Sequence, residues 1–74
     1  MAKKLIGEPW LRAQMKRNGY GSLQEVAEAA NLHRGNLWRY FQFLTRPSID
    51  VIPRLAYALD VTVMDVMTAL EADK

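Results

Sequence analysis

Residues 34–39 carry the side chains best suited to hydrogen bonding with the edges of DNA bases. An arginine guanidinium can donate two hydrogen bonds to guanine, and an asparagine amide can pair with adenine. A glycine lets the backbone approach the floor of the major groove, and a tryptophan can pack on thymine methyl groups or on sugars. The predicted base-contacting residues are therefore Arg34, Gly35, Asn36, Trp38 and Arg39.

These side chains can act together only if they share one face of a helix. At about 100° per residue, a helix over residues 33–43 places Gly35, Arg39 and Gln42 on one side and an apolar set opposite. Trp38 flanks the polar side, where it either meets DNA or folds back over its neighbours at the edge of the core. The apolar set, which we expect in the core, is Leu37, Tyr40, Phe41 and Leu44.

Phosphate groups would be bound by side chains and backbone amides around this helix. Arg46 lies in the loop that follows, and Ser48 is predicted to begin the next helix, whose first N–H groups lack helical partners and attract anions. His33 could touch a phosphate from the helix start, whereas a lone histidine without partner ligands is no metal site. The other predicted backbone contacts are Lys16, Arg17, Arg34 and Gln42.

A very short turn joins this helix to the one before it, which is typical of a helix-turn-helix motif. The earlier helix is predicted over residues 22–30, where the Ser22 hydroxyl accepts an amide hydrogen bond and Glu25 reaches back to the Ser22 N–H. It ends at Asn31, a residue type that tolerates the left-handed conformation of a tight turn. Its predicted inner face is Val26, Ala27 and Ala30.

Three further helices are expected, beginning near Gly7, Ser48 and Thr62. The last of them opens with a capping box formed by Thr62 and Asp65. Pro53 conflicts with a helix from Ser48, because proline lacks an N–H group and bends a helix unless it lies in the first turn. In the helix from Gly7 the predicted inner face is Leu11 and Met15. In the helix from Ser48 it is Ile49, Ile52, Leu55, Ala56 and Leu59, and in the helix from Thr62 it is Val63, Val66, Met67 and Leu70.

Five short helices joined by tight turns predict an all-α orthogonal bundle, formed by a single domain over residues 1–74. The chain has no cysteine, and no apolar run approaches the ~20 residues that span a bilayer. Residues 1–46 hold eight of the ten lysines and arginines but three of the eight acidic residues, so the remainder is net negative. This asymmetry would turn the basic part toward a polyanion. We expect a cytoplasmic protein that is associated with the nucleoid when bound to DNA.

No residue pattern indicates an enzyme. The sequence offers no paired carboxylates at a cleft, no nucleophile with a base and no glycine-rich phosphate loop, and it has one histidine. We therefore expect neither catalysis nor a metal or other cofactor.

Residues 22–37, followed by residues 47–50 and 55–61, resemble the Cro/cI-type helix-turn-helix family, also called XRE-like or lambda-repressor-like. The resemblance runs without a gap from Ser22 to Met67. It implies a compact five-helix orthogonal bundle of the lambda-repressor-like DNA-binding type, with residues 33–43 as the recognition helix. It also implies a transcriptional regulator that binds double-stranded DNA sequence-specifically.

Four residues depart from the pattern of that family. Leu23 stands where a glutamine that often touches the DNA backbone is usual, so Gln24 is the predicted substitute for this contact. Phe41 replaces a common glutamate, and Phe43 and Asp60 replace usual glycines. The fold pattern is kept, but the loop after the recognition helix becomes unusually apolar.

One small domain contacts few base pairs, so specificity predicts a homodimer that reads a palindromic operator with half-sites about one helical turn apart. A bare DNA-binding domain acts most simply as a Cro-like repressor, by occupancy, and activation through a surface patch is the other mode that the sequence allows. The alternative is a protein-binding helical module, such as an antitoxin or an anti-repressor, with a toxin or another regulator as partner. Apolar residues left over once the core is filled mark the predicted dimer interface, namely Phe43, Leu44, Met64 and Leu70.

Overall fold

The computed structural model describes residues 5–71, which form five helices and no strand. The helices are α1 (Gly7–Asn18), α2 (Leu23–Ala30), α3 (Arg34–Phe41), α4 (Val51–Leu59) and α5 (Val63–Ala69). The predicted all-α five-helix fold is confirmed. None of the helices within residues 5–71 is long and apolar enough to cross a membrane.

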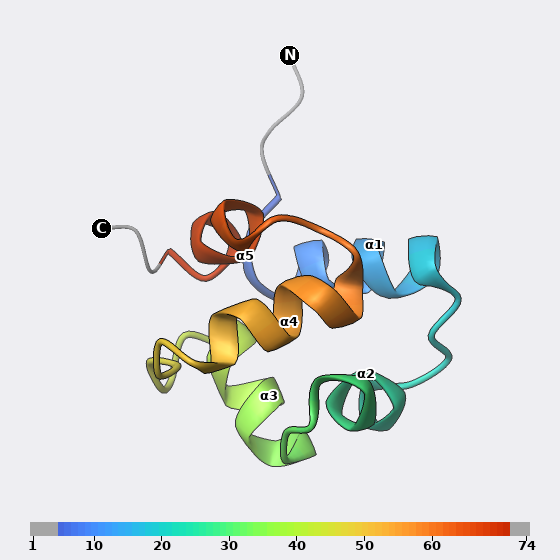
Figure 1. The fold of residues 1–74 in the computed structure, drawn as a ribbon, viewed down its shortest axis with the longest axis horizontal. Coiled ribbons are helices and arrows are strands. Elements are labelled where there is room, and N and C mark those ends of the chain that lie inside the picture. The colour runs from blue at the N-terminus through green and yellow to red at the C-terminus, as the bar shows by residue number, and fades with distance from the viewer. Residues whose placement is uncertain (1–4, 72–74) are drawn as a thin grey trace.

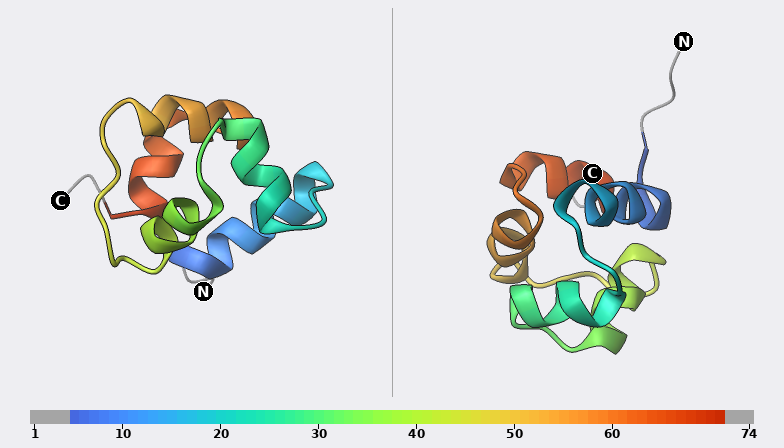
Figure 2. Two further views of the ribbon diagram at one scale, coloured as in Figure 1. Left: turned by 90° about the horizontal axis from the view of Figure 1, so that it is seen from below. Right: turned by 90° about the vertical axis from the view of Figure 1, so that its right-hand side faces the viewer.

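The helices enclose one core, with α2 and α3 on one side of the bundle and α1 and α5 on the other (Figure 1). Helix α4 runs between the two pairs, as the further views also show (Figure 2). Every helix contributes to the core because each carries apolar side chains on one face. The largest fully buried side chains are those of Phe41, Leu37, Leu55, Leu59, Val26 and Val66.

All five helices are followed by a turn with one residue in the left-handed conformation. After α2, the N–H of Asn31 donates to Glu28 O and the N–H of Leu32 donates to Ala27 O, which is the Schellman pattern. The predicted stop at Asn31 is therefore confirmed, with φ of 57°. The left-handed residues after α1, α3, α4 and α5 are Gly19, Phe43, Asp60 and Glu71.

The helix starts follow the predicted caps with one difference. Thr62 and Asp65 form the reciprocal capping box at α5. At α2 the Ser22 hydroxyl accepts from the Glu25 N–H, but the Glu25 carboxylate accepts from the N–H of Gly21 rather than from that of Ser22. The expected second half of this capping box was therefore wrong by one residue.

Helix α3 is shorter than predicted, and it ends at Phe41 instead of at residue 43. Phe43 then adopts φ of 60°, and its N–H donates to Tyr40 O while the N–H of Leu44 donates to Arg39 O. This turn carries Leu44 out of the helix register, so its side chain is 65% exposed instead of packing in the core. The predicted core position of Leu44 is thus wrong.

The fourth helix begins at Val51, three residues later than predicted, and this resolves the conflict at Pro53. Pro53 is the third residue of α4, where an N–H group would have no partner within the helix. Ser48 precedes a turn, in which its carbonyl oxygen accepts from the Val51 N–H. Ile49 is consequently 89% exposed and not on the inner face, and Val63 at the start of α5 is exposed as well.

Candidate functional site

The outer face of α3 presents all five predicted base-contacting residues to solvent. Helix α3 lies at one edge of the bundle (Figure 1), and its C-terminal end contacts α1. Leu37 and Phe41 anchor its inner face in the core, so the opposite face must point outward. One side-chain hydrogen bond crosses this face, from Arg39 Nη1 to Asn36 Oδ1 at 3.4 Å. The exposed residues are Arg34, Gly35, Asn36, Trp38 and Arg39.

Two open hollows border the outer face of α3. One, of about 550 Å³, lies at the turn between α2 and α3 and brings Gln24 and His33 next to Arg34. The other, of about 420 Å³, is lined by Leu23, Arg34, Gly35, Trp38 and Arg39. The predicted residues Gln24 and His33 therefore lie on the same side of the molecule as the base-contacting set.

Several exposed basic side chains have no acidic partner in the described part of the chain, among them Arg34 and Arg39 on the outer face of α3. Within residues 5–71, no carboxylate forms an ion pair with Lys16, Arg34, Arg39 or Arg46. By contrast, Arg12 pairs with Glu8 and Arg54 pairs with Asp50. Cations without a counter-charge favour a polyanion such as the DNA backbone.

Arg17, predicted to contact phosphate, is also engaged within the protein. Its Nη2 donates to the carbonyl oxygens of Leu59 and Asp60 at 2.9 and 3.0 Å. Its Nε donates to Gln14 Oε1 at 2.9 Å. The guanidinium thus satisfies carbonyl groups at the C-terminal end of α4, which have no partner within the helix.

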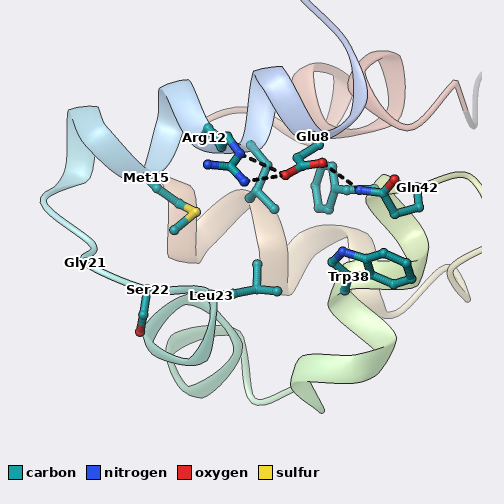
Figure 3. A pocket seen from close by; sticks show the side chains of 10 residues that line it. Glu8, Arg12, Met15, Gly21, Ser22, Leu23, Trp38 and Gln42 are labelled. Atoms are coloured by element: carbon teal, nitrogen blue, oxygen red, sulfur yellow. Dashed lines mark hydrogen bonds and ion pairs between the residues drawn. The ribbon is translucent and has the colours of Figure 1, made fainter.

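Gln42 is held by a carboxylate that sequence reasoning missed. Its Nε2 donates to Glu8 Oε1 at 2.9 Å, and the other Glu8 oxygen accepts from Arg12 at 2.8 Å (Figure 3). The hydrogen bond from Gln42, followed by the one from Arg12, lowers the pKa of Glu8. Residues 8 and 42 are too far apart in sequence for local spacing to reveal this contact.

The anion site predicted at Ser48 is not formed. Because α4 begins at Val51, the amide of Ser48 is not at a helix start. The Ser48 hydroxyl donates to Asp50 Oδ1 at 2.6 Å, and Asp50 Oδ2 accepts from Arg54 at 2.7 Å. The hydrogen bond from Ser48 is the main cause of the lowered pKa of Asp50. A carboxylate next to the hydroxyl opposes a phosphate contact there.

Trp38 is half-exposed, at 46%, and does not stand free of the protein. It borders both the 420 Å³ hollow and a second one of about 300 Å³ between α1 and the α2–α3 pair. Figure 3 shows Trp38 and Leu23 facing this second hollow from α3 and α2. Leu23 thus lies beside the exposed face of α3, whereas the sequence indicated only that it departs from a family pattern.

The predicted interface residues differ in exposure. Phe43, Leu44 and Met64 are exposed, whereas Leu70 is only 7% exposed and belongs to the core. The premise that Leu70 is left over once the core is filled is therefore wrong. Leu70 nevertheless borders a hollow of about 280 Å³, whose other lining residues are Tyr40, Phe43, Leu44, Thr45, Arg46 and Pro47.

Within residues 5–71, no group of three histidine, cysteine or acidic residues could hold a metal ion. Residues 11–71 match the family model of the Cro/C1-type helix-turn-helix DNA-binding domain. The matched segment contains α2, α3 and the turn between them. No curated protein and no solved structure matched the chain significantly.

Proposed function

Because the chain belongs to the Cro/C1-type helix-turn-helix DNA-binding domain family and is a DNA-binding transcriptional regulator, we propose that α3 is its recognition helix. In this proposal the outer face of α3 enters the major groove. The observation that carries it is the exposed polar face, on which Arg34 and Arg39 have no carboxylate partner among residues 5–71. The proposed base contacts are Arg34, Gly35, Asn36, Trp38 and Arg39.

The DNA backbone would be held by residues around this face. Arg46 and Lys16 are exposed cations, and Gln24 and His33 border the hollow next to Arg34. Phosphate contacts fix the position and orientation of the protein but carry no sequence information. Gln42 can contribute only if its amide leaves Glu8. We leave Arg17 and Ser48 out of the proposed set, because their polar groups are engaged within the protein.

The proposed active form is a homodimer on a palindromic operator. Phe43 and Leu44 are exposed and line one hollow together, which supports a protein contact because monomeric surfaces rarely gather such side chains. Met64 is exposed as well. The segment between α3 and α4 runs along the edge of the bundle beside α5 (Figure 2). A second copy packed at this edge would place two recognition helices on one face of the DNA, about one helical turn apart. Repression by promoter occupancy, in the cytoplasm, follows as the simplest regulatory outcome.

The same apolar edge also suits a different protein, such as a toxin or another regulator. A purely protein-binding module would have no use for the cationic outer face of α3. We therefore propose DNA as the principal ligand and treat a further protein partner as a possible addition.

Two substitutions test the separation of base reading from backbone binding. Replacing Arg39 by alanine should cost ~1–3 kcal/mol on the preferred site and relax selectivity at one base position per half-site, since a bidentate guanine contact is lost. Replacing Arg46 by alanine should weaken binding to all sequences nearly equally. It should also lower the magnitude of the slope of log K against log salt by about 1 per subunit, because one phosphate contact disappears.

The measurements are selection of bound sequences from a random DNA library and fluorescence anisotropy at several salt concentrations. Arg54→Ala is a suitable control, because Arg54 is engaged by Asp50 and the carbonyl of Asn31. An unchanged site preference in Arg39→Ala, together with an altered one in Arg46→Ala, would rule out α3 as the recognition helix.

A further inference from the structure

The 420 Å³ hollow beside α3 combines an apolar wall with a basic rim. Leu23, from the first turn of α2, and Trp38, from α3, supply the apolar part. Arg34 and Arg39 border the same hollow, and none of its lining residues is acidic. Gly35 completes the lining without a side chain, and a Cβ atom added there would meet no protein atom within 4 Å. The hollow is thus open to a ligand from outside.

The major groove of DNA offers one apolar group that fits such a wall. This group is the C5 methyl of thymine, and a C5 methyl on cytosine projects into the groove from the same ring position. An unmethylated cytosine or uracil has no apolar group there. The neighbouring arginines can donate to the O6 and N7 atoms of guanine in the same groove. Methyl and guanine can therefore be contacted together by one short stretch of this surface.

We propose that Leu23, Gly35 and Trp38 form a pocket for the 5-methyl group of a pyrimidine. This pyrimidine is paired with, or next to, a guanine that Arg34 or Arg39 binds. The inference rests on the proposed role of α3 and specifies one ligand of its outer face. Thymine and 5-methylcytosine share the recognised group, so the pocket accepts both and disfavours uracil and unmethylated cytosine.

The expected loss of affinity when the methyl group is absent follows from the burial of one carbon atom. Removing a methyl group that is buried on binding weakens affinity about fourfold per half-site, from the ~0.8 kcal/mol that one buried carbon group contributes. The guanine contacts do not depend on the methyl group. Selectivity for guanine should therefore persist when selectivity for the methyl group is lost.

The test uses the full chain and three pools of randomised duplex DNA, synthesised with dTTP, with dUTP in place of dTTP, or with 5-methyl-dCTP in place of dCTP. We expect a thymine next to a guanine in sequences selected from the first pool. In the uracil pool the enrichment of uracil at that position should be weaker than that of thymine in the first pool. In the 5-methylcytosine pool, 5-methylcytosine should be enriched there as strongly as thymine. Equal motifs in the first two pools would overturn this inference alone. No enrichment in any pool would overturn the proposed function as well.

Substitution of Leu23 tests whether the preference for thymine over uracil arises in the pocket. With the selected duplex, the ratio of the dissociation constants for uracil and thymine DNA should fall from about four per half-site toward one in Leu23→Ala. The ratio is measured on one protein sample, so a partial folding defect cancels. Leu23→Gln preserves side-chain size but removes the apolar contact, and should also lower the ratio. Leu5→Ala, a half-exposed leucine outside the hollow, should leave it unchanged. An unaltered ratio in both Leu23 variants would contradict the pocket.

Discussion

At the scale of single residues, the outer face of α3 combines one glycine with arginines that have no carboxylate partner among residues 5–71. Gly35 is the second residue of α3, and the space above it is open to solvent. Glycine in a helix is less stable than alanine by roughly 0.5–1 kcal/mol. Nothing in the described fold requires a glycine here, so alanine at this position tests whether the bound ligand requires one.

Gly35→Ala should therefore separate stability from binding. The free protein should become more stable, by up to about 1 kcal/mol, because the unfolded chain loses freedom and the new methyl group meets no protein atom. Operator affinity should fall about tenfold or more, since a methyl group forced into a close contact costs ~1–3 kcal/mol. Thermal unfolding and anisotropy titration measure the two effects. Unchanged affinity would mean that the backbone at Gly35 does not approach a base.

At the scale of the elements, α1 fixes the C-terminal end of α3 through three contacts. Trp10 stacks on Phe41, with ring centroids 6.0 Å apart. Glu8 accepts the hydrogen bond from Gln42. The ring of Phe43 lies over Gly7, where a Cβ atom would come within 2.9 Å of the ring. Helix α1 thus sets the orientation in which α3 presents its outer face.

The contact between Glu8 and Gln42 predicts a measurable titration. In Gln42→Ala the pKa of Glu8 should rise toward its ordinary value, because the largest cause of the lowered pKa is removed. A lowered pKa in the folded state contributes stability that is present above the ordinary pKa and is lost as the pH falls through the lowered one. The variant should therefore lose less stability on acidification than the parent protein. NMR titration of the carboxyl groups measures the pKa of Glu8 in the parent protein and in Gln42→Ala. The pKa of Asp50 is an internal control and should be the same in both proteins.

The contact between Gly7 and Phe43 predicts a difference between two glycine variants. Gly7 and Gly19 both have positive φ, of 64° and 79°, so alanine at either should cost ~1–2 kcal/mol in backbone strain. At Gly19 the added methyl group has open space, whereas at Gly7 it meets the Phe43 ring and the Phe41 carbonyl oxygen. Denaturant unfolding should therefore show a larger loss for Gly7→Ala. Equal losses would mean that the Phe43 ring moves aside freely.

At the scale of the whole molecule, the polar face of α3 and the apolar edge at Phe43 and Leu44 differ in chemical character. The edge includes Phe43 and Leu44, which the left-handed turn after α3 carries away from the core. Leu70 forms part of the adjoining hollow while remaining buried in the monomer. A second copy could pack against this edge without disturbing the core.

Leu44→Asp should convert the proposed dimer to a monomer. Its side chain is exposed in the single chain, so the fold should tolerate the change, but a charge buried unpaired in an interface costs ~3–5 kcal/mol. Light scattering at tens of micromolar should show half the mass of the parent protein, and operator affinity should fall. Tyr57→Asp, at an exposed position on α4, should leave the mass and the operator affinity unchanged. A parent protein that is monomeric both free and on its operator would exclude the dimer.

Local sequence signals determined most of the elements, because they act within one or two turns of the chain. The caps at Ser22 and Thr62, the turn residue Asn31 and the spacing of Leu37 and Phe41 place α2, α3 and α5 correctly to within about two residues. The exposed set on α3 follows from the same spacing, since residues on one face of a helix are fixed by its period. Their contacts with DNA remain predictions.

Only the tertiary structure decided which of these side chains are available. Arg17 donates to carbonyl groups 42 and 43 residues away, and Gln42 donates to a carboxylate 34 residues away. The burial of Leu70 and the exposure of Leu44 depend likewise on how α3, α5 and the intervening turn pack. Helical periodicity fixes the face on which a residue lies, but it does not specify which distant residue will meet that face. That choice is made when the helices pack, because the partner groups come from segments far apart in sequence.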